Sequence, residues 1–541
     1  MTKGDGVVRT GKRSMAAPAL VGAALMCVYV ATLAPTVTYW DAGEFLSAIH
    51  SLGIPHPPGT PMFVLVANVW AKIFSPVLGF AYSVNLFSAV CTATACLIAA
   101  WLMQRWTGDS IASVAGGLSA GLMSSVWLNA TETEVYSPAL LVSLILLLVA
   151  DRARETRERR WLVLLAYTIG FGYSLQLSAL VAAPAAVFLA LWRWPLRGSV
   201  ARSPNVAARA IRATGASMAI AATIGASALL FMLVRAKHDP AINQGNPVTW
   251  QALSDVITRR QYLPVSMLPR QAPFYLQVGN MFEYADWQVA LGLAPDPPPS
   301  LARTTATLVF AALGVVGFAW HRRKHAPSWE AMTLLFITAT LGVVVYLNMK
   351  ASPSYGGGFL SITAKHEARE RDYFFALGFI CWGMWAGAGA VRALSRFGRS
   401  GQLAGVAIAA LPAVLNWAAV DRNHNAQAYD PRNNAARILM RAQKNAVVFA
   451  VGDNDTYPVW YMQVVEGLRR DVTIVTLPLL GAGWYREELA RRHLLLGSEF
   501  LGRWQGISAT YSEICERSRT LGRPIVSAEA PGAPPVPHAC K

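Results

Sequence analysis

The apolar run MAAPALVGAALMCVYVATLAP (Met15 to Pro35) is followed almost at once by TYWDAGEFLSAIHSLGIPHPPGTP (Thr38 to Pro61). The run is long enough to cross a bilayer as a helix, which takes about 20 apolar residues. No small-residue cleavage pattern ends it and many similar runs follow, so we expect an uncleaved first membrane helix. Asp41 and Glu44 are the only acids between residues 6 and 108. The sequence therefore predicts a polar site at the mouth of the first span.

The composition indicates a polytopic membrane protein, because 54% of the 541 residues are apolar and only 14% are charged. The net charge of +17 is spread over short basic clusters between apolar runs, without a long basic face or zinc-finger spacing. Such clusters orient membrane helices, so a nucleic-acid partner is not expected. The partners expected are the lipid bilayer, a lipid-linked sugar, and a protein or glycan acceptor.

We predict about eleven spans within a transmembrane domain of residues 15–420. They lie near 15–34, 81–103, 110–128, 137–151, 161–177, 178–194, 213–235, 303–320, 329–348, 373–390 and 404–420. The basic loops share one side with the N-terminus, residues 1–14, and the positive-inside rule makes that side cytoplasmic. The loops expected on the opposite, outer side are residues 35–80, 129–136, 236–302 and 349–372. A bacterial inner membrane would fit this arrangement.

The tail, residues 421–541, differs from the rest of the chain in its sequence pattern. Apolar runs of strand length, AVVFAV and DVTIVTL, alternate with helix-like patterns, which predicts a small α/β extracytoplasmic domain. Cys515 and Cys540 lie in this tail, and they could form a disulfide if it is outside the cytoplasm.

Two acid pairs are predicted on the outer side. Asp41 and Glu44 have the spacing of a capping box at the start of a helix, and the same spacing would hold two catalytic carboxylates on one turn. Glu132 and Glu134, in TETEVYSP, either make a short loop soluble or belong to the same site. The sequence alone leaves both alternatives open.

Basic residues on the outer side need a reason, because the positive-inside rule disfavours them in short loops. They are Arg259, Arg260, Lys365, His366, Arg369 and Arg371. The run from Lys365 to Arg371 is either a solvated helix or an anion site, and arginine forks suit phosphate. A phosphate at this depth would belong to a lipid headgroup. A carboxylate here could bind a divalent metal, but no clustered ligand spacing requires a metal site.

Together these features predict transfer of a sugar from a lipid phosphate carrier. A carboxylate would take the proton of an acceptor hydroxyl, and cations would stabilise the departing phosphate. The alternatives are a transporter or flippase of lipid-linked sugars, and a receptor or scaffold. A transporter usually places ionisable groups near the bilayer midplane and often shows repeated halves, neither of which is seen here.

Several motifs resemble one family of polytopic membrane proteins, which includes the animal O-mannosyltransferase of plexin-type receptor IPT domains. The resemblance covers most of the chain from about residue 35 to 485. The matching segments are PTVTYWDAGEFLSAIHSLGIPHPPGTP, TETEVYSP, AINQGNPVTW, RRQY, HEARERDYFF, GDNDTYPVWYMQVVEGLRRDV and LLGAGWY. The resemblance implies a GT-C glycosyltransferase, which uses a polyprenyl-phosphate sugar as donor substrate and inverts the anomeric carbon.

The resemblance also assigns site residues. Asp41 occupies the place of the GT-C catalytic acid, and Glu44 and Glu134 match acidic family positions. The expected donor-phosphate ligands are Arg259, Arg260, His366, Arg369 and Arg371. The expected acceptor or sugar contacts are His56, Tyr136, Asp453 and Asp455, although GDNDTYP also reads as a turn after a strand. Gln176 departs from the family, in which this stretch often holds a histidine.

The resulting hypothesis is an integral membrane glycosyltransferase. It would move a hexose, mannose in the first instance, to Ser or Thr of an envelope protein or to a glycan, with Asp41 as general base.

Overall fold

The computed structural model describes residues 14–192, 204–262, 266–354, 360, 363–528 and 540. The expected cytoplasmic N-terminus, residues 1–14, lies outside this part of the chain except for its last residue. So do parts of the expected span at 178–194 and of the outer loop at 349–372.

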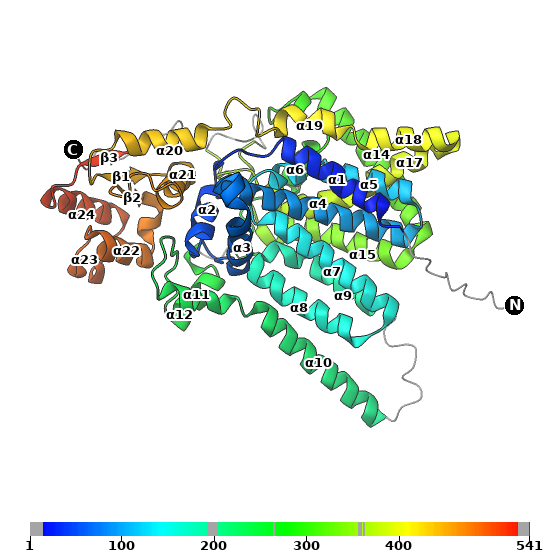
Figure 1. Ribbon diagram of the computed structural model, residues 1–541, viewed down its shortest axis with the longest axis horizontal. Coiled ribbons are helices and arrows are strands. Elements are labelled where there is room, and N and C mark those ends of the chain that lie inside the picture. Colours follow the sequence, from blue (N-terminus) through cyan, green and yellow to red (C-terminus); the bar gives the residue numbers. More distant parts are fainter. Residues whose placement is uncertain are drawn as a thin grey trace.

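A bundle of α-helices forms the larger part of the molecule (Figure 1). Its helix α17 (Ala376–Leu394) packs against α5 (Ser110–Gly121) and α14 (Leu301–Lys324). Small residues permit this packing, since a Cβ atom on Gly389 would lie 1.9 Å from the carbonyl oxygen of Leu313. The other bundle helices are α1 (Ala16–Ala31), α4 (Phe80–Thr107), α6 (Ser124–Ala130), α7 (Tyr136–Thr156), α8 (Arg159–Leu175), α9 (Ala183–Leu191), α10 (Pro204–Ala226), α11 (Leu229–Ala236), α15 (Ala326–Ile337), α16 (Val343–Leu347), α18 (Gly398–Ala409) and α19 (Pro412–Val420).

Within the described residues, seven helical stretches are long and apolar enough to cross a membrane, or eight if the bent pair α5 and α6 counts as one span. The predicted polytopic helical protein is confirmed. The count of about eleven spans stays a prediction, because this measure leaves out apolar helices shorter than 18 residues. α1 has only 16 residues, and the run from 161 to 194 breaks into short helices. The two spans expected between 373 and 420 correspond to α17 and to α18 with α19, and α18 packs back on α17 within the apolar helical stretch Asp372–Val420.

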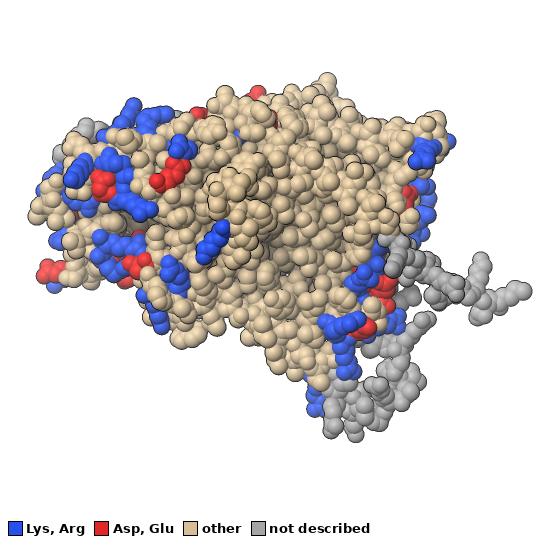
Figure 2. All heavy atoms as spheres, viewed as in Figure 1, with Lys and Arg blue, Asp and Glu red and all other residues tan. Residues whose placement is uncertain are grey.

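Charged side chains gather at the two ends of the molecule on the face shown in Figure 2, and few lie between them. One charged end is the C-terminal α/β region, and the other lies at the opposite end of the bundle (Figures 1 and 2). The weakly charged surface between them suits the hydrocarbon core of a bilayer.

The expected outer segments are more ordered than loops. Residues 35–80 contain α2 (Ala42–Ser51) and α3 (Pro61–Leu78), and α3 is itself among the apolar stretches of spanning length. The segment after α11 contains α12 (Trp250–Ile257) and α13 (Phe274–Asp286). α3 was not expected, because it follows a proline- and glycine-rich segment that is typical of a loop.

The C-terminal region is the small α/β unit that the sequence predicts. Its parallel sheet has the order β2-β1-β3, with β1 (Val447–Ala450) between β2 (Thr473–Thr476) and β3 (Ile525–Ser527). The helices of the unit are α20 (Asp430–Arg441), α21 (Asp453–Val464), α22 (Gly483–His493), α23 (Ser498–Gly502) and α24 (Ile507–Thr520). Cys515 and Cys540 form a disulfide.

The α/β unit contacts the bundle where α21 packs on α2 (Figure 1). A Cβ atom on Gly43 would lie 2.3 Å from the carbonyl oxygen of Tyr457, so only glycine permits this approach. The backbone N–H of Trp40 also donates to Oδ1 of Asn454 at 2.7 Å. These contacts place Asp41 beside the start of α21.

Candidate active site

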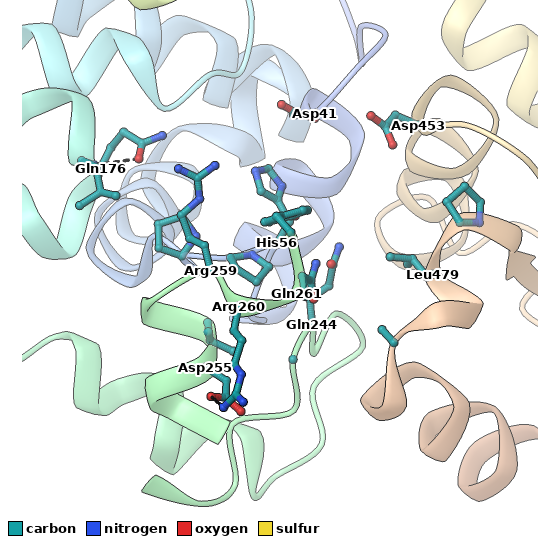
Figure 3. A pocket seen from close by; sticks show the side chains of 18 of the residues that line it. Asp41, His56, Gln176, Gln244, Asp255, Arg259, Arg260, Gln261, Asp453 and Leu479 are labelled. Atoms are coloured by element: carbon teal, nitrogen blue, oxygen red, sulfur yellow. Dashed lines mark hydrogen bonds and ion pairs between the residues drawn. The ribbon is translucent and has the colours of Figure 1, made fainter. Parts of the chain in front are cut away.

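A cavity of about 1530 Å³ lies at the junction of the bundle and the α/β unit (Figure 3). One part of its wall is apolar and comes from bundle segments, including Leu180, Val181 and Val343. Other parts of the wall are polar and carry both signs of charge. The charged residues of the wall include Asp41, His56, Asp255, Arg259, Arg260, Arg369, Arg371, Asp453 and Glu487.

Asp41 precedes α2, but its side chain makes no capping hydrogen bond. Its Oδ2 instead accepts from Nη2 of Arg369 at 2.6 Å, so the capping box suggested by the sequence does not form. Burial raises the pKa of Asp41, but the positive charges of Arg369 and His56 outweigh this and hold the pKa below its usual value. Asp41 is therefore an ionised carboxylate in the wall of the cavity.

Glu44 is completely buried behind His56 and does not line the cavity. It accepts from the backbone N–H of His56 at 2.8 Å, contacts Nδ1 of the same ring at 2.5 Å, and accepts from Nε2 of Gln244. Burial lowers the pKa of His56, but the charges of Glu44 and Asp41 raise it to about 9. His56 thus carries a positive charge at neutral pH, and Glu44 holds its ring in place.

The arginines differ in their surroundings. Arg369 lies 5.2 Å from the ring centre of Trp40 and 5.2 Å from that of Tyr373, which fixes its guanidinium beside Asp41. Arg371 donates to the hydroxyl of Tyr373 at 3.0 Å. Both arginines come from the run Lys365 to Arg371, which was expected to be either a solvated helix or an anion site, and the Arg369 side chain is only 15% exposed. The structure therefore does not form the solvated helix.

The two arginines of the RRQY motif have different surroundings. Arg260 pairs with Oδ1 of Asp255 at 3.2 Å, and Figure 3 shows it turned toward that residue. Arg259 extends toward the level of His56 and Gln176 in the same view. Arg259 lies 5.9 Å from the ring centre of Tyr262 and has no ion pair among the described residues, so it is the arginine of this motif that is placed to meet a ligand in the cavity.

The other acidic residues considered in the sequence lie in different positions relative to the cavity. Asp453 lines the cavity near Asp41, and burial together with the charge of Asp41 raises the pKa of Asp453 to about 6. Glu134 is buried outside the cavity wall, and burial followed by the charge of Asp41 raises its pKa well above the usual value. Glu132 accepts from Thr38 at 2.7 Å and from Arg422 at 2.6 Å, so this acid pair does more than keep a loop soluble.

The structure does not bring two other predicted residues to the cavity. His366 contacts the carbonyl oxygen of Ser352 through Nδ1 at 2.7 Å, and Asp455 is buried at the start of α21. Tyr136 does line the wall, 4.6 Å from the ring of Tyr373.

Sequence reasoning assigned no role to several residues of the wall. They include Gln176, Gln244, Tyr262, Tyr457 and Trp484. Gln244 and Tyr262 lie in the motifs AINQGNPVTW and RRQY, which were the only sequence signal for this part of the wall. Among the described residues, no group of three or more His, Cys, Asp or Glu side chains could hold a metal ion.

The fold and the cavity together define a polytopic α-helical membrane protein with a charged cavity under a small α/β unit. Within this class, residues 41–197 match the N-terminal domain of the protein O-mannosyl-transferase TMEM260, and residues 431–494 match TMEM260-associated domain 2. The family resemblance indicated by the motifs is confirmed. The two matched regions supply Asp41 and Asp453, which lie together in the cavity wall.

Two curated relatives carry the same name. The mouse protein O-mannosyl-transferase TMEM260 is 34% identical over 146 residues, which are 26% of this chain and 20% of the relative. The tmem260 protein of Dictyostelium discoideum is 24% identical over 127 residues, which are 23% of this chain and 16% of the relative. The matched region thus spans about a fifth of these relatives.

Among solved structures, the chain is similar to ArnT from Cupriavidus metallidurans in the apo state, with a TM-score of 0.49 and 12% identity over 88% of this chain and 94% of that one. The same protein bound to undecaprenyl phosphate gives a TM-score of 0.42 and 14% identity over 85% and 90% of the two chains.

Proposed function

We propose that this protein is a GT-C-like membrane glycosyltransferase that moves a hexose, mannose in the first instance, from a polyprenyl phosphate to Ser or Thr of an extracytoplasmic protein. The observation that carries the proposal is the composition of the cavity wall. Apolar residues from the bundle meet Arg259, Arg369 and Arg371 in one space. An amphiphile with an apolar tail and a phosphate headgroup has the matching chemistry.

The family match supports the same proposal, because both curated relatives are named protein O-mannosyl-transferases. The lipid phosphate named in one ArnT structure belongs to the same chemical class as the donor proposed here. The orientation proposed places the cavity and the α/β unit on the outer side of a bacterial inner membrane.

In the proposed reaction, Asp41 takes the proton of the acceptor hydroxyl as that oxygen bonds to the anomeric carbon of the sugar. The bond from this carbon to the phosphate oxygen breaks, and the electron pair leaves with the polyprenyl phosphate. Attack from the face opposite the phosphate inverts the anomeric carbon. Arg369, Arg371 and Arg259 stabilise the negative charge that develops on the phosphate.

The ion pair between Asp41 and Arg369 implies that donor binding precedes proton transfer in this reaction. While Arg369 neutralises the carboxylate at 2.6 Å, Asp41 is a weak base because its pKa is lowered. A donor phosphate bound by Arg369 would share that positive charge and weaken its hold on Asp41. Donor binding therefore makes Asp41 a stronger base.

The proposal predicts that Asp41→Asn lowers hexose transfer by at least about 100-fold, the range of general-base effects. The measurement is intact-glycopeptide mass spectrometry of envelope proteins from cells with equal levels of wild type or variant. Glu466→Gln, which removes a carboxylate outside the cavity, is the matched control, and Asp41→Glu tests whether a carboxylate alone suffices.

Hexose on Ser or Thr with wild type and Glu466→Gln but not with Asp41→Asn is the expected result. Equal glycopeptide levels in all strains would contradict the role of Asp41. If purified protein released no hexose from a polyprenyl-phosphate donor, a transporter of lipid-linked sugars would replace the transferase.

A further inference from the structure

Three side chains of the cavity wall present hydrogen-bond donors, and no acceptors, to the cavity. They are His56, Gln176 and Arg259, which come from three separate segments of the chain. In Figure 3 they lie at one level of the cavity, with Asp41 beyond His56. Nδ1 of His56 and Oε1 of Gln176 are already used by other groups, and arginine has no acceptor atom. This set therefore fits a ligand that is rich in acceptor oxygens.

Glu44 fixes the orientation of the His56 ring. Its Oε2 lies 2.5 Å from Nδ1 of His56, and its Oε1 accepts from the backbone N–H of the same residue at 2.8 Å. The other ring nitrogen, Nε2, has no hydrogen-bond partner among the described residues, and 26% of the His56 side chain is exposed. His56 is charged at neutral pH, so Nε2 offers the cavity a charge-assisted N–H.

Gln176 presents its NH2 group to the cavity. Its Oε1 accepts from the backbone N–H of Leu177 at 2.8 Å, which settles the orientation of the amide, because a backbone N–H requires an acceptor. Its Nε2 has no partner within the described part of the chain. Gln176 leads directly into the 3-10 helix Leu177–Ala182, and Leu180 and Val181 of this helix line the same wall. The donors thus adjoin an apolar surface.

A phosphate matches these donors better than a sugar does. A sugar hydroxyl both donates and accepts, so its own proton would lack an acceptor beside these three groups. Phosphate oxygens accept, and hydrogen bonds from charged donors such as His56 and Arg259 are stronger than those between neutral groups. The carboxylates of Asp41 and Asp453 lie beyond His56 in Figure 3, where they can accept from hydroxyl groups of the sugar and of the acceptor.

We propose that Gln176 and His56 bind the phosphate of the lipid donor together with Arg259, and that Nε2–H of His56 donates to the phosphate oxygen that leaves the sugar. This inference rests on the proposed function and assigns His56 to the phosphate, in place of the acceptor or sugar contact that the family resemblance implies.

The contact with His56 acts on the charge that the reaction creates. As the bond between the anomeric carbon and this oxygen breaks, the electron pair stays on the oxygen and the N–H of His56 stabilises it. The proton stays on the ring, because the second pKa of an alkyl phosphate is about 6 whereas the pKa of His56 is raised to about 9.

The first test uses ligands that contain neither sugar nor acceptor. The purified full-length protein in detergent is titrated with a polyprenyl phosphate and with the corresponding polyprenol, which lacks the phosphate. His56→Gln and Gln176→Glu should each raise the Kd of the polyprenyl phosphate by about tenfold or more and change that of the polyprenol by less than about twofold. His424→Gln and Gln505→Glu are the matched controls, because His424 also pairs with a carboxylate and neither residue lines the cavity.

An unchanged Kd of the polyprenyl phosphate in either cavity variant would overturn the proposal. Equal loss of affinity for both ligands in both cavity variants would also overturn it, since these residues would then only maintain the shape of the wall.

The second test uses the wild type and so does not depend on the folding of a variant. The titratable and charged groups around Glu44 and His56 are Asp41, Tyr262, Arg369, Asp453 and Tyr457. Burial raises the pKa of both tyrosines, and burial with the charge of Asp41 raises that of Asp453 to about 6. Of these groups, His56 is therefore the one that loses its charge near pH 9.

The Kd of the polyprenyl phosphate for the wild type should rise by about fivefold or more between pH 8 and pH 10, while that of the polyprenol stays constant. A constant Kd of the polyprenyl phosphate over this range would overturn the contact with His56.

Hexose transfer by the wild type separates this inference from the proposed function. If the wild type transfers hexose and the cavity variants bind the polyprenyl phosphate as tightly as it does, the transferase stands and the two phosphate contacts fail. If the wild type transfers no hexose and binds the polyprenyl phosphate no better than the polyprenol, the proposed function fails, and this inference fails with it.

Discussion

Asp41 and Glu44 lie on one turn of the chain, yet the fold gives them different surroundings. Asp41 faces the cavity and Arg369, whereas Glu44 is completely buried and contacts His56 and Gln244. Asp41 is therefore the carboxylate of the two that lines the cavity, as the proposed base must, and Glu44 holds His56 and Gln244. The sequence placed both acids at the site, but spacing alone did not reveal which one reaches the cavity.

At the scale of single residues, we predict that Glu44→Gln lowers the stability of the fold in a pH-dependent way. The pKa of His56 is raised to about 9, so the folded state binds this proton more tightly than the unfolded chain does. The resulting stabilisation is complete below pH 6.5, the ordinary pKa, and is lost as the pH rises through about 9. The His56 side chain is 26% exposed, and solvent therefore weakens this effect. We expect the proton on His56 to contribute about 2 kcal/mol to the free energy of unfolding.

Thermal unfolding of the purified protein between pH 6 and pH 10 checks this expectation. The difference in unfolding temperature between wild type and Glu44→Gln should be largest near pH 6 and should shrink above pH 9. Glu466→Gln, which removes an acid without a histidine partner, should show no such trend. A difference that stays constant over this range would mean that Glu44 does not act through the charge of His56.

At the scale of the elements, the site depends on the close approach of α2 and α21. Apolar runs and turn residues predict the helical bundle and the small α/β unit, because both follow from local patterns. The packing of α21 on α2 could not be predicted in this way, since Gly43 in the DAGEF segment gives no local sign of its partner. For the same reason Gln244 and Trp484, which close the cavity from two further segments, were not foreseen as site residues.

We predict that Gly43→Ala separates these two helices. The added Cβ atom would lie 2.3 Å from backbone oxygen, and backbone cannot move aside as a flexible side chain can. The expected result is a stability loss of about 1 to 3 kcal/mol and a fall in hexose transfer. Gly215→Ala is the control, because nothing lies within 4 Å of a Cβ atom there and alanine favours the helix. Equal unfolding temperatures and transfer rates for the two variants would contradict this packing argument.

At the scale of the whole molecule, the weakly charged surface between two charged ends fixes how the protein lies in a bilayer (Figure 2). The sequence predicted this surface from hydropathy and basic loops, whereas the helix breaks within long apolar runs depend on packing and could not be predicted. Which end faces the cytoplasm stays a prediction from the basic loops.

Cysteine labelling in intact cells tests that orientation. A membrane-impermeant maleimide should label Arg503→Cys, in the exposed part of the α/β unit, without permeabilisation. It should label Arg160→Cys, in the exposed first turn of α8, only after the membrane is opened. The unaltered chain gives the background from its own cysteines. The reverse pattern would place the cavity in the cytoplasm and exclude the proposed outer acceptor.

The hydrogen bond between Trp40 and Asn454 joins residues 414 positions apart, and it lies where the cavity wall closes. During synthesis the first span and Asp41 therefore enter the membrane long before α21 exists. Under the proposed function, a nascent chain would have no complete cavity for its lipid donor until α21 has been made. A chain truncated before α21 would therefore lack Asp453 and Tyr457 from the cavity wall.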